Sequence, residues 1–239
     1  DIMSMTPKAP KGFSNYVSGV ICVSSKNKEE SIKLGLTNET KCVVFPNAVN
    51  TELFHLMNKK VIREKMGISA NKFIIAFVGW FNERKGIMRV VEALSKCEGE
   101  PIYSFFIGSG SLEPKIKNIL FKGRLMHEQI PEYLNAADIF VLPTLREGCC
   151  NAVVEAMSCG LPIVSSNLPF NWDVLNESNS IMINPTNIDN IASAIINLRD
   201  DKLKRKLLST GAIQKASELT IDNRASNIIK YMENKITGH

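Results

Sequence analysis

Between residues 71 and 200, short apolar segments alternate regularly with segments of helical period, and no other feature of the 239-residue chain restricts its fold as strongly. Strands are predicted at 73–78, 102–107, 119–121, 139–143, 162–165 and 181–183, and helices at 86–95, 112–119, 127–136, 152–159, 188–198 and 200–234. This alternation specifies an α/β fold with a doubly wound parallel sheet. The ligand of such a domain is expected at the carboxyl ends of the strands.

Upstream of residue 71, fewer strands and helices are predicted. A strand, a helix and a second strand are predicted at 17–23, 26–34 and 42–45. Pro46 and Asn47 then break the pattern, and a polar helix at 60–66 ends at Gly67. We therefore divide the chain into the tail of one domain (1–46), a linker with a first helix (47–70), the main α/β domain (71–215) and a C-terminal helix (216–239).

The net charge of +5 is concentrated on the two flanks of the chain. Residues 1–70 carry ten Lys and Arg against six Asp and Glu, and residues 191–239 carry nine against five, whereas residues 71–190 carry ten against thirteen. Nucleic acid is not expected as a partner, because the site region lacks the basic face that it needs. The flanking charge suits an anionic membrane surface, an anionic partner or solubility.

The longest apolar runs, at 73–78 and 139–142, are far shorter than the roughly 20 residues of a membrane-spanning helix. The sequence also starts without the basic region and apolar stretch of a secretory signal. These observations predict a cytoplasmic protein, and the basic flanks add peripheral contact with the inner face of the membrane to that prediction.

The six cysteines and three histidines show no metal-binding spacing, so we expect reduced thiols and no metal site. The adjacent Cys149 and Cys150 can be interpreted as a redox centre or as small, soft packing residues beside a ligand. The second interpretation is favoured.

Two glycine-containing loops follow predicted strands. The loop at 79–86 carries Arg84 and Lys85 at the start of a helix, where backbone N–H groups and the helix dipole add to their charge and favour an anion. Two solvated surface cations would give the same pattern. The turn at 108–111, G-S-G-S, allows close approach of a ligand, but it matches neither G-x-G-x-x-G nor a P-loop, so a plain tight turn explains it equally well.

The segment from Glu147 to Glu155, E-G-C-C-N-A-V-V-E, carries the most specific chemistry. Glu147 follows a strand, residues 149–151 offer free amides at a helix start, and Glu155 lies about one turn further along. Two carboxylates displaced along one ligand suit two sets of sugar hydroxyls, with the amides facing a negatively charged link between them. One carboxylate could merely complement the helix dipole, but that explanation does not cover the whole segment.

This segment resembles the signature of retaining glycosyltransferases of family 4, the group 1 family, which has the two-domain GT-B fold. The similar features are E-x7-E with Gly148, E-A-M at 155–157 and C-G-L-P at 159–162, together with A-A-D-I-F-V-L-P at 136–143, F-K-G-R at 121–124 and P-N-A-V-N at 46–50. The resemblance covers about residues 17–235. It implies a Rossmann-like C-terminal GT-B domain at 71–215, preceded at 1–46 by a short remnant of the acceptor-side N-terminal domain.

The resemblance also implies roles for single residues. It places Glu147 on the transferred sugar, Glu155 on the ribose hydroxyls and Lys85 on the diphosphate. The backbone of Cys149, Cys150 and Asn151 would face the sugar and phosphates, and Gly123 and Arg124 would lie near the base. Gly79, Gly108 and Gly148 complete the set of donor-binding residues. Two positions depart from the family: Trp80 stands where an Arg is usual, with Arg84 as the candidate substitute, and Cys149-Cys150 replaces Phe-Gly, as in a subset associated with bacterial surface-polysaccharide synthesis.

The resemblance implies transfer of a sugar from a UDP- or GDP-linked donor to a glycan or lipid-linked acceptor, with retention. Arg84, Lys85 and the amides of 149–151 would stabilise the departing diphosphate without a metal or another cofactor, and the sequence has no D-x-D motif. We expect the isolated chain to bind nucleotide but transfer little sugar, because the acceptor-side domain is incomplete. Two alternatives are a non-catalytic nucleotide-sugar-binding module and a GT-B sugar epimerase, although the epimerase would lack the E-x7-E context.

Overall fold

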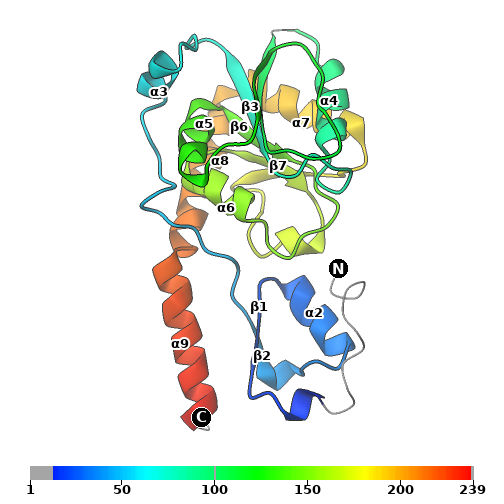
Figure 1. Cartoon of the computed structure of the whole chain (residues 1–239), viewed down its shortest axis with the longest axis vertical. Helices are drawn as coiled ribbons and strands as arrows, with labels where there is room; N and C mark the ends of the chain where they lie inside the picture. Colours follow the sequence, from blue (N-terminus) through cyan, green and yellow to red (C-terminus); the bar gives the residue numbers. More distant parts are fainter. Residues whose placement is uncertain (1–12, 100, 238–239) are drawn as a thin grey trace.

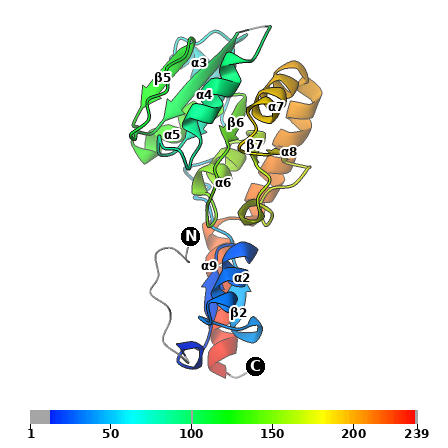
Figure 2. The same cartoon turned by 90° about the vertical axis from the view of Figure 1, so that its right-hand side faces the viewer.

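The computed structural model describes residues 13–99 and 101–237, which form a large α/β body and a smaller lobe (Figure 1). The body contains a six-stranded sheet and the lobe a two-stranded one. The last helix, α9 (Ile221–Thr237), leaves the body and runs along the lobe behind α2 (Ser25–Lys33) and β2 (Cys42–Val44), as Figure 2 shows. Residues near both ends of the sequence therefore build the lobe.

The sheet of the large body is parallel throughout, with the order β5-β4-β3-β6-β7-β8. Its strands are β3 (Phe73–Val78), β4 (Ile102–Ile107), β5 (Ile119–Gly123), β6 (Ile139–Leu142), β7 (Ile163–Ser166) and β8 (Ser180–Ile183). After β3, the chain adds β4 and then β5 on one side of β3. It then returns to add β6 on the other side of β3. The strand order thus reverses between β3 and β6, which is where such folds bind ligands.

Helices cover both faces of this sheet. They are α3 (Lys59–Lys65), α4 (Ile87–Ser95), α5 (Ile130–Ala136), α6 (Asn151–Ser158), α7 (Ile188–Asp200) and α8 (Lys202–Glu218), with single turns η3 (His127–Gln129) and η4 (Pro169–Asn171). Helices α4 and α7 pack together on one face, and α5, α6 and α8 lie on the other (Figure 1). The predicted doubly wound α/β fold is confirmed.

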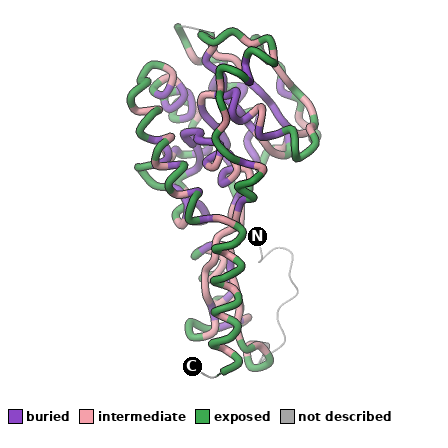
Figure 3. Tube along the Cα trace, turned by 90° about the vertical axis from the view of Figure 1, so that its left-hand side faces the viewer, coloured by how far each residue is buried: buried purple, intermediate pink, exposed green. Residues whose placement is uncertain are grey.

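The burial of the central strands explains why the sheet could be predicted from the sequence. Residues 74–77 of β3 and 139–142 of β6 are fully buried, as expected for parallel strands covered on both faces. Figure 3 shows buried residues throughout the interior of the body, whereas the lobe is mostly intermediate or exposed. The hydrophobic effect therefore holds the body together far more strongly than the lobe.

The predicted helix at 112–119 is wrong. Residues 108–118 contain no helix, although they connect the parallel strands β4 and β5. Pro114 disfavours the helical conformation at Glu113, because its ring clashes with the preceding residue. Asn118 then takes a left-handed φ of 64° before β5 begins. Eight residues interrupted in this way cannot nucleate a stable helix.

The strands of the lobe are also shorter than predicted. Its strand β1 covers only Val20–Cys22 and pairs in parallel with β2, flanked by single turns η1 (Phe13–Asn15) and η2 (Glu39–Lys41). The predicted tail at 1–46 includes residues 1–12, which lie outside the described ranges. The two-stranded sheet has little surface of its own to bury, so its position depends on contacts with α2 and α9.

A break at Leu219 and Thr220 separates α8 from α9 within the predicted helical region at 200–234. Val49 N donates to Leu219 O (2.9 Å), and Thr220 Oγ1 accepts from Asn223 N (3.1 Å), which caps the new helix. From there α9 reaches the lobe, where Tyr231 Oη donates to Lys41 O at 2.6 Å. No helix in the described part of the chain is long and apolar enough to cross a membrane.

Asp138 connects the linker helix α3 to the sheet by hydrogen bonds and ion pairs. Its Oδ2 accepts from Arg63 Nη2 and from Ile74 N, both at 2.8 Å, and its Oδ1 lies 3.0 Å from Lys59 Nζ. The Arg63 side chain is 4% exposed and donates to three backbone carbonyls as well. Loss of the carboxylate would leave a buried cation poorly compensated.

We therefore expect Asp138→Asn to lower the free energy of unfolding by about 3 kcal/mol, the magnitude typical of a broken buried pair. The control is Asp189→Asn, because the Asp189 side chain is 77% exposed in its pair with Lys96, and exposed pairs contribute under about 1 kcal/mol. Urea unfolding followed by circular dichroism measures both. Equal losses in the two variants would contradict this account of Asp138.

Candidate active site

Three glycine-containing loops meet at the carboxyl ends of β3, β4 and β5. Gly79 N donates to Ile107 O at 3.0 Å, and Gly108 N donates to Gly123 O at 2.8 Å. Gly108 has a φ of +143°, and a Cβ there would lie 1.9 Å from Gly79 O, so no other residue fits. The structure thus brings three of the four predicted glycines, 79, 108 and 123, together on one edge of the sheet.

Glu147 lies at the point where the strand order reverses. Its Oε1 is 2.6 Å from Lys85 Nζ, 3.1 Å from Arg84 Nη1 and 2.9 Å from Thr144 Oγ1. The Glu147 and Lys85 side chains are 12% and 11% exposed, whereas Arg84 is 45% exposed. The three residues predicted as catalytic therefore form one cluster. Two cations facing one carboxylate leave the cluster positive, which suits an anionic ligand.

The start of α6 lies against this cluster. Residues 149–151 lead into the helix with Cys150 as its N-cap, and the amides of a first helical turn have no acceptor within the helix. Cys150 Sγ lies 3.8 Å from Lys85 Nζ. At Gly148, a Cβ would lie 3.1 Å from Val23 Cγ2, so the smaller lobe approaches this loop closely.

Four hydrogen bonds also connect the linker and the lobe to the large body. Asn47 Nδ2 donates to Cys149 O at 2.9 Å and to Asn151 Oδ1 at 2.7 Å. Ser25 donates from its backbone N and its Oγ to the two carboxylate oxygens of Asp173, at 2.7 and 2.5 Å. The linker therefore bonds directly to the loop at 147–151, while the lobe bonds to the large body at Asp173.

Glu155 faces the loop that follows β5. Its Oε1 lies 3.0 Å from His127 Nε2, and its side chain is 13% exposed while that of His127 is 55% exposed. The His127 ring also packs on Phe54, with 4.9 Å between ring centroids. Glu155 is thus a mostly buried carboxylate held in one orientation at the side of the site.

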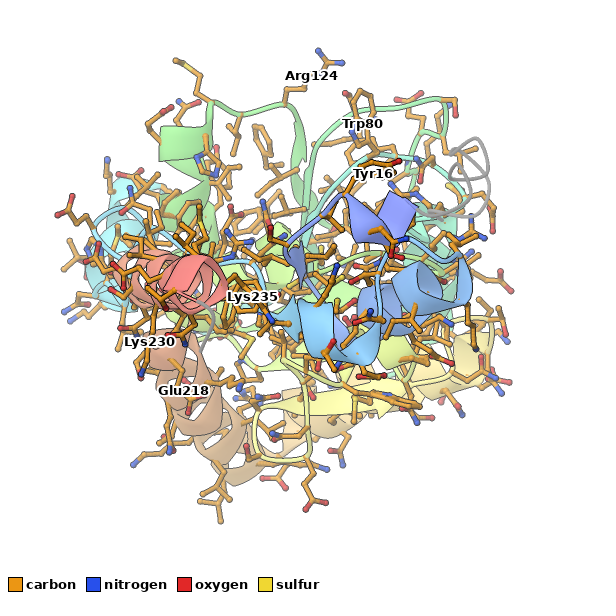
Figure 4. The ribbon with its side chains drawn as sticks, turned by 90° about the horizontal axis from the view of Figure 1, so that it is seen from below. Tyr16, Trp80, Arg124, Glu218, Lys230 and Lys235 are labelled. Carbon is orange, nitrogen blue, oxygen red and sulfur yellow. The ribbon has the colours of Figure 1, made fainter. Side chains whose placement is uncertain are left out.

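Arg124 and Trp80 lie at the other end of the site. Arg124 Nε donates to Ser109 Oγ at 2.6 Å, and its Cζ lies 6.0 Å from the centroid of the Trp80 ring. Figure 4 shows both side chains on the same edge of the molecule. Trp80 is 58% exposed. The second cation at Glu147 is Arg84.

Sequence reasoning did not assign Thr144, Asn47 or His127 to the site. Thr144 stands just after the predicted strand at 139–143, three residues before Glu147, and this position was the only available signal. Asn47 and His127 are far from Glu147 and Glu155 in sequence. Only the folded chain shows that they touch residues 149–155.

All six cysteines lie in the described ranges and are free. Burial raises the pKa of the Cys149 thiol to about 11 and also raises the pKa of Cys150, where the nearby Lys85 offsets the effect only in part. Both thiols are therefore protonated at neutral pH, which favours packing over a redox role. In the parts of the chain that the structure covers, no three His, Cys, Asp or Glu side chains gather as a metal site, and metal independence stays a prediction.

The family model for glycosyl transferases group 1 matches residues 58–215, which is more than half of the chain. The chain therefore belongs to the group 1 glycosyltransferase family, in agreement with the resemblance carried by Glu147 to Glu155.

Two curated relatives show how far the similarity extends. The chain is 33% identical over 200 residues to the UDP-Gal:alpha-D-GlcNAc-diphosphoundecaprenol alpha-1,3-galactosyltransferase of Escherichia coli, covering 77% of this chain and 52% of that protein. It is 26% identical over 200 residues to the putative teichuronic acid biosynthesis glycosyltransferase TuaC of Bacillus subtilis, covering 82% and 50%. The chain thus spans about half the length of these curated relatives.

Solved structures of GT-B glycosyltransferases share the fold. The structure of Anabaena Alr3699/HepE in complex with UDP has a TM-score of 0.82 at 19% identity, covering 93% of this chain and 65% of that one. The sucrose-phosphate synthase of Thermosynechococcus elongatus has a TM-score of 0.79 at 21% identity, covering 92% and 59%. At these identities the similarity establishes the fold alone.

The raised pKa values predict slow alkylation of the native protein at neutral pH. Because the pKa of Cys149 is about 11, iodoacetamide should label it slowly at pH 7.5 and much faster as the pH approaches 10.5, where thiolate forms. Mass spectrometry of tryptic peptides gives the rate, and urea-unfolded protein at pH 7.5 is the control. Labelling of Cys149 at pH 7.5 as fast as in the unfolded chain would support the redox interpretation instead.

Proposed function

We propose that this chain is the donor-binding half of a retaining glycosyltransferase that transfers a sugar from a UDP- or GDP-linked donor to a glycan or lipid-linked acceptor. The observation that carries the proposal is the cluster of Lys85 and Arg84 on one oxygen of Glu147 beside the start of α6. The names of the relatives support the substrates, since they include a UDP-galactose donor, a diphosphoundecaprenol-linked acceptor and teichuronic acid synthesis. Such acceptors agree with a cytoplasmic enzyme at the inner face of the membrane.

The proposed chemistry depends on charge that develops at the donor diphosphate. As the bond between the anomeric carbon and the phosphate oxygen breaks, its electron pair moves to the diphosphate. Lys85 has three N–H donors, so it can keep its bond to Glu147 while donating to a phosphate oxygen. Arg84 and the amides of 149–151 add positive potential in a partly buried site, where it acts strongly. The acceptor oxygen bonds to the anomeric carbon on the face of the leaving group, and its proton passes to the departing phosphate.

Other residues would hold the rest of the donor. We assign Glu155 to the ribose hydroxyls, because its carboxylate is mostly buried and its orientation is set by His127. Glu147 would bind the hydroxyls of the transferred sugar, and Gly123 and Arg124 would lie beside the base. The glycines at 79, 108 and 148 let the backbone approach the ligand closely.

We expect Lys85→Ala and Glu155→Ala to weaken binding of a UDP- or GDP-sugar roughly tenfold to a hundredfold, because each removes a hydrogen bond that involves a charged group. Isothermal titration calorimetry on the isolated chain measures the affinities. Lys65→Ala and Glu132→Ala are matched controls, since these two side chains form a 2.6 Å surface pair, 66% and 38% exposed, away from the site. If both site variants bind the donor as tightly as the controls do, the site assignment fails.

Metal independence and retention require an acceptor-side domain for their test. We expect this chain, joined to the N-terminal half of a relative, to transfer sugar at an unchanged rate in EDTA, because cations of the protein neutralise the diphosphate. The product should keep the anomeric configuration of the donor, as measured by NMR coupling constants, while the chain alone should transfer little. Loss of turnover in EDTA or an inverted product would contradict the mechanism.

A further inference from the structure

Trp80 is an exposed aromatic side chain on a rigid part of the site. It directly follows Gly79 at the end of β3, and the residue is 58% exposed. The surrounding backbone is fixed, since Phe81 N donates to Ser109 O at 2.8 Å and Asn82 N donates to Trp80 O at 3.0 Å. A large ring that is held in place yet uncovered is suited to contact a ligand.

Arg124 lies over the Trp80 ring. Its Cζ is 6.0 Å from the ring centroid, which is within the range of a cation–π contact. The bond from Arg124 Nε to Ser109 Oγ at 2.6 Å holds the guanidinium in this place, and Figure 4 shows Arg124 and Trp80 on the same edge of the molecule. A flat ring between the two groups would need about 7 Å, from two contacts of about 3.5 Å, so a base can stack only on the Trp80 face that Arg124 leaves uncovered.

The position of this pair along the sheet indicates which part of the donor it meets. In the strand order β5-β4-β3-β6, Arg124 follows β5 and Glu147 follows β6. Three strand spacings of about 4.8 Å separate these ends by about 14 Å. Lys85 contacts Glu147, and Glu155 contacts His127 three residues after Arg124. A donor whose sugar lies at Glu147 and whose ribose lies at Glu155 therefore extends its nucleoside toward Arg124.

We propose that Trp80 is a specificity residue whose indole stacks on the nucleobase of the donor, through the ring face that Arg124 does not cover. This inference rests on the proposed function, because it requires a nucleotide in the site. Arg124 and Trp80 then hold the base, while Lys85 and Arg84 hold the diphosphate. A residue that acts on the base alone should leave the binding of diphosphate unchanged.

The test uses the intrinsic fluorescence of the whole chain. The sequence contains two tryptophans, so Trp172→Phe leaves Trp80 as the only reporter. We expect UDP or GDP to quench its emission and inorganic pyrophosphate to leave it unchanged. In calorimetry, Trp80→Ala should weaken nucleotide binding about tenfold, the usual effect of removing one base-stacking ring, and Trp80→Phe should recover most of the affinity. The wild-type chain, Trp80→Ala and Trp80→Phe should all bind pyrophosphate with equal affinity.

The outcomes separate this inference from the proposed function. If the wild-type chain binds neither UDP nor GDP, the proposed function and this inference both fail. If a nucleotide binds but Trp80 emission and the affinity of Trp80→Ala do not change, the inference fails while the function stands. Equal quenching by pyrophosphate would place Trp80 at the phosphates and would also overturn the role at the base.

Discussion

The site depends on one carboxylate oxygen that is shared by two cations. Glu147 Oε1 contacts Lys85 from the loop after β3 and Thr144 from the loop after β6, so it links the two strands between which the strand order reverses. Arg84 joins the same oxygen. The same two loops are also joined through the backbone, since Leu145 N donates to Arg84 O at 2.8 Å. An anionic ligand can therefore take part in the side-chain cluster while the backbone contact between the loops stays in place.

The rest of the fold positions this contact. Glycines let the loops after β3 and β4 approach one another, since a Cβ at Gly108 would lie 1.9 Å from Gly79 O. The linker and the smaller lobe contact the large body from the other side, through Asn47 on Cys149 O and Ser25 on Asp173. Helix α9 in turn holds the lobe. The chain therefore uses both of its basic flanks to support a site built by its middle.

Local pattern was sufficient to predict most of the sheet. Strands at 73–78 and 102–107 were predicted with the observed bounds, because parallel strands buried on both faces are continuous apolar runs between turns. The helix at 112–119 was wrong because Pro114 and the left-handed Asn118 outweighed its apolar spacing. The lobe was harder to predict, because it is held in part by α9, whose Tyr231 donates to Lys41 O from 190 residues away in the sequence. Of the candidate site, the sequence indicated Glu147, Lys85 and Arg84, while the contacts of Asn47 and His127 are tertiary and leave no local signal.

We infer that a nucleoside diphosphate binds between Lys85 and the start of α6. The decisive experiment is a crystal structure of the chain with bound UDP. We expect phosphate oxygens within hydrogen-bond distance of Lys85 Nζ and of the amides of residues 149–151, with Glu155 on the ribose. A nucleotide bound elsewhere, with Lys85 and Arg84 still occupied by Glu147 alone, would contradict it.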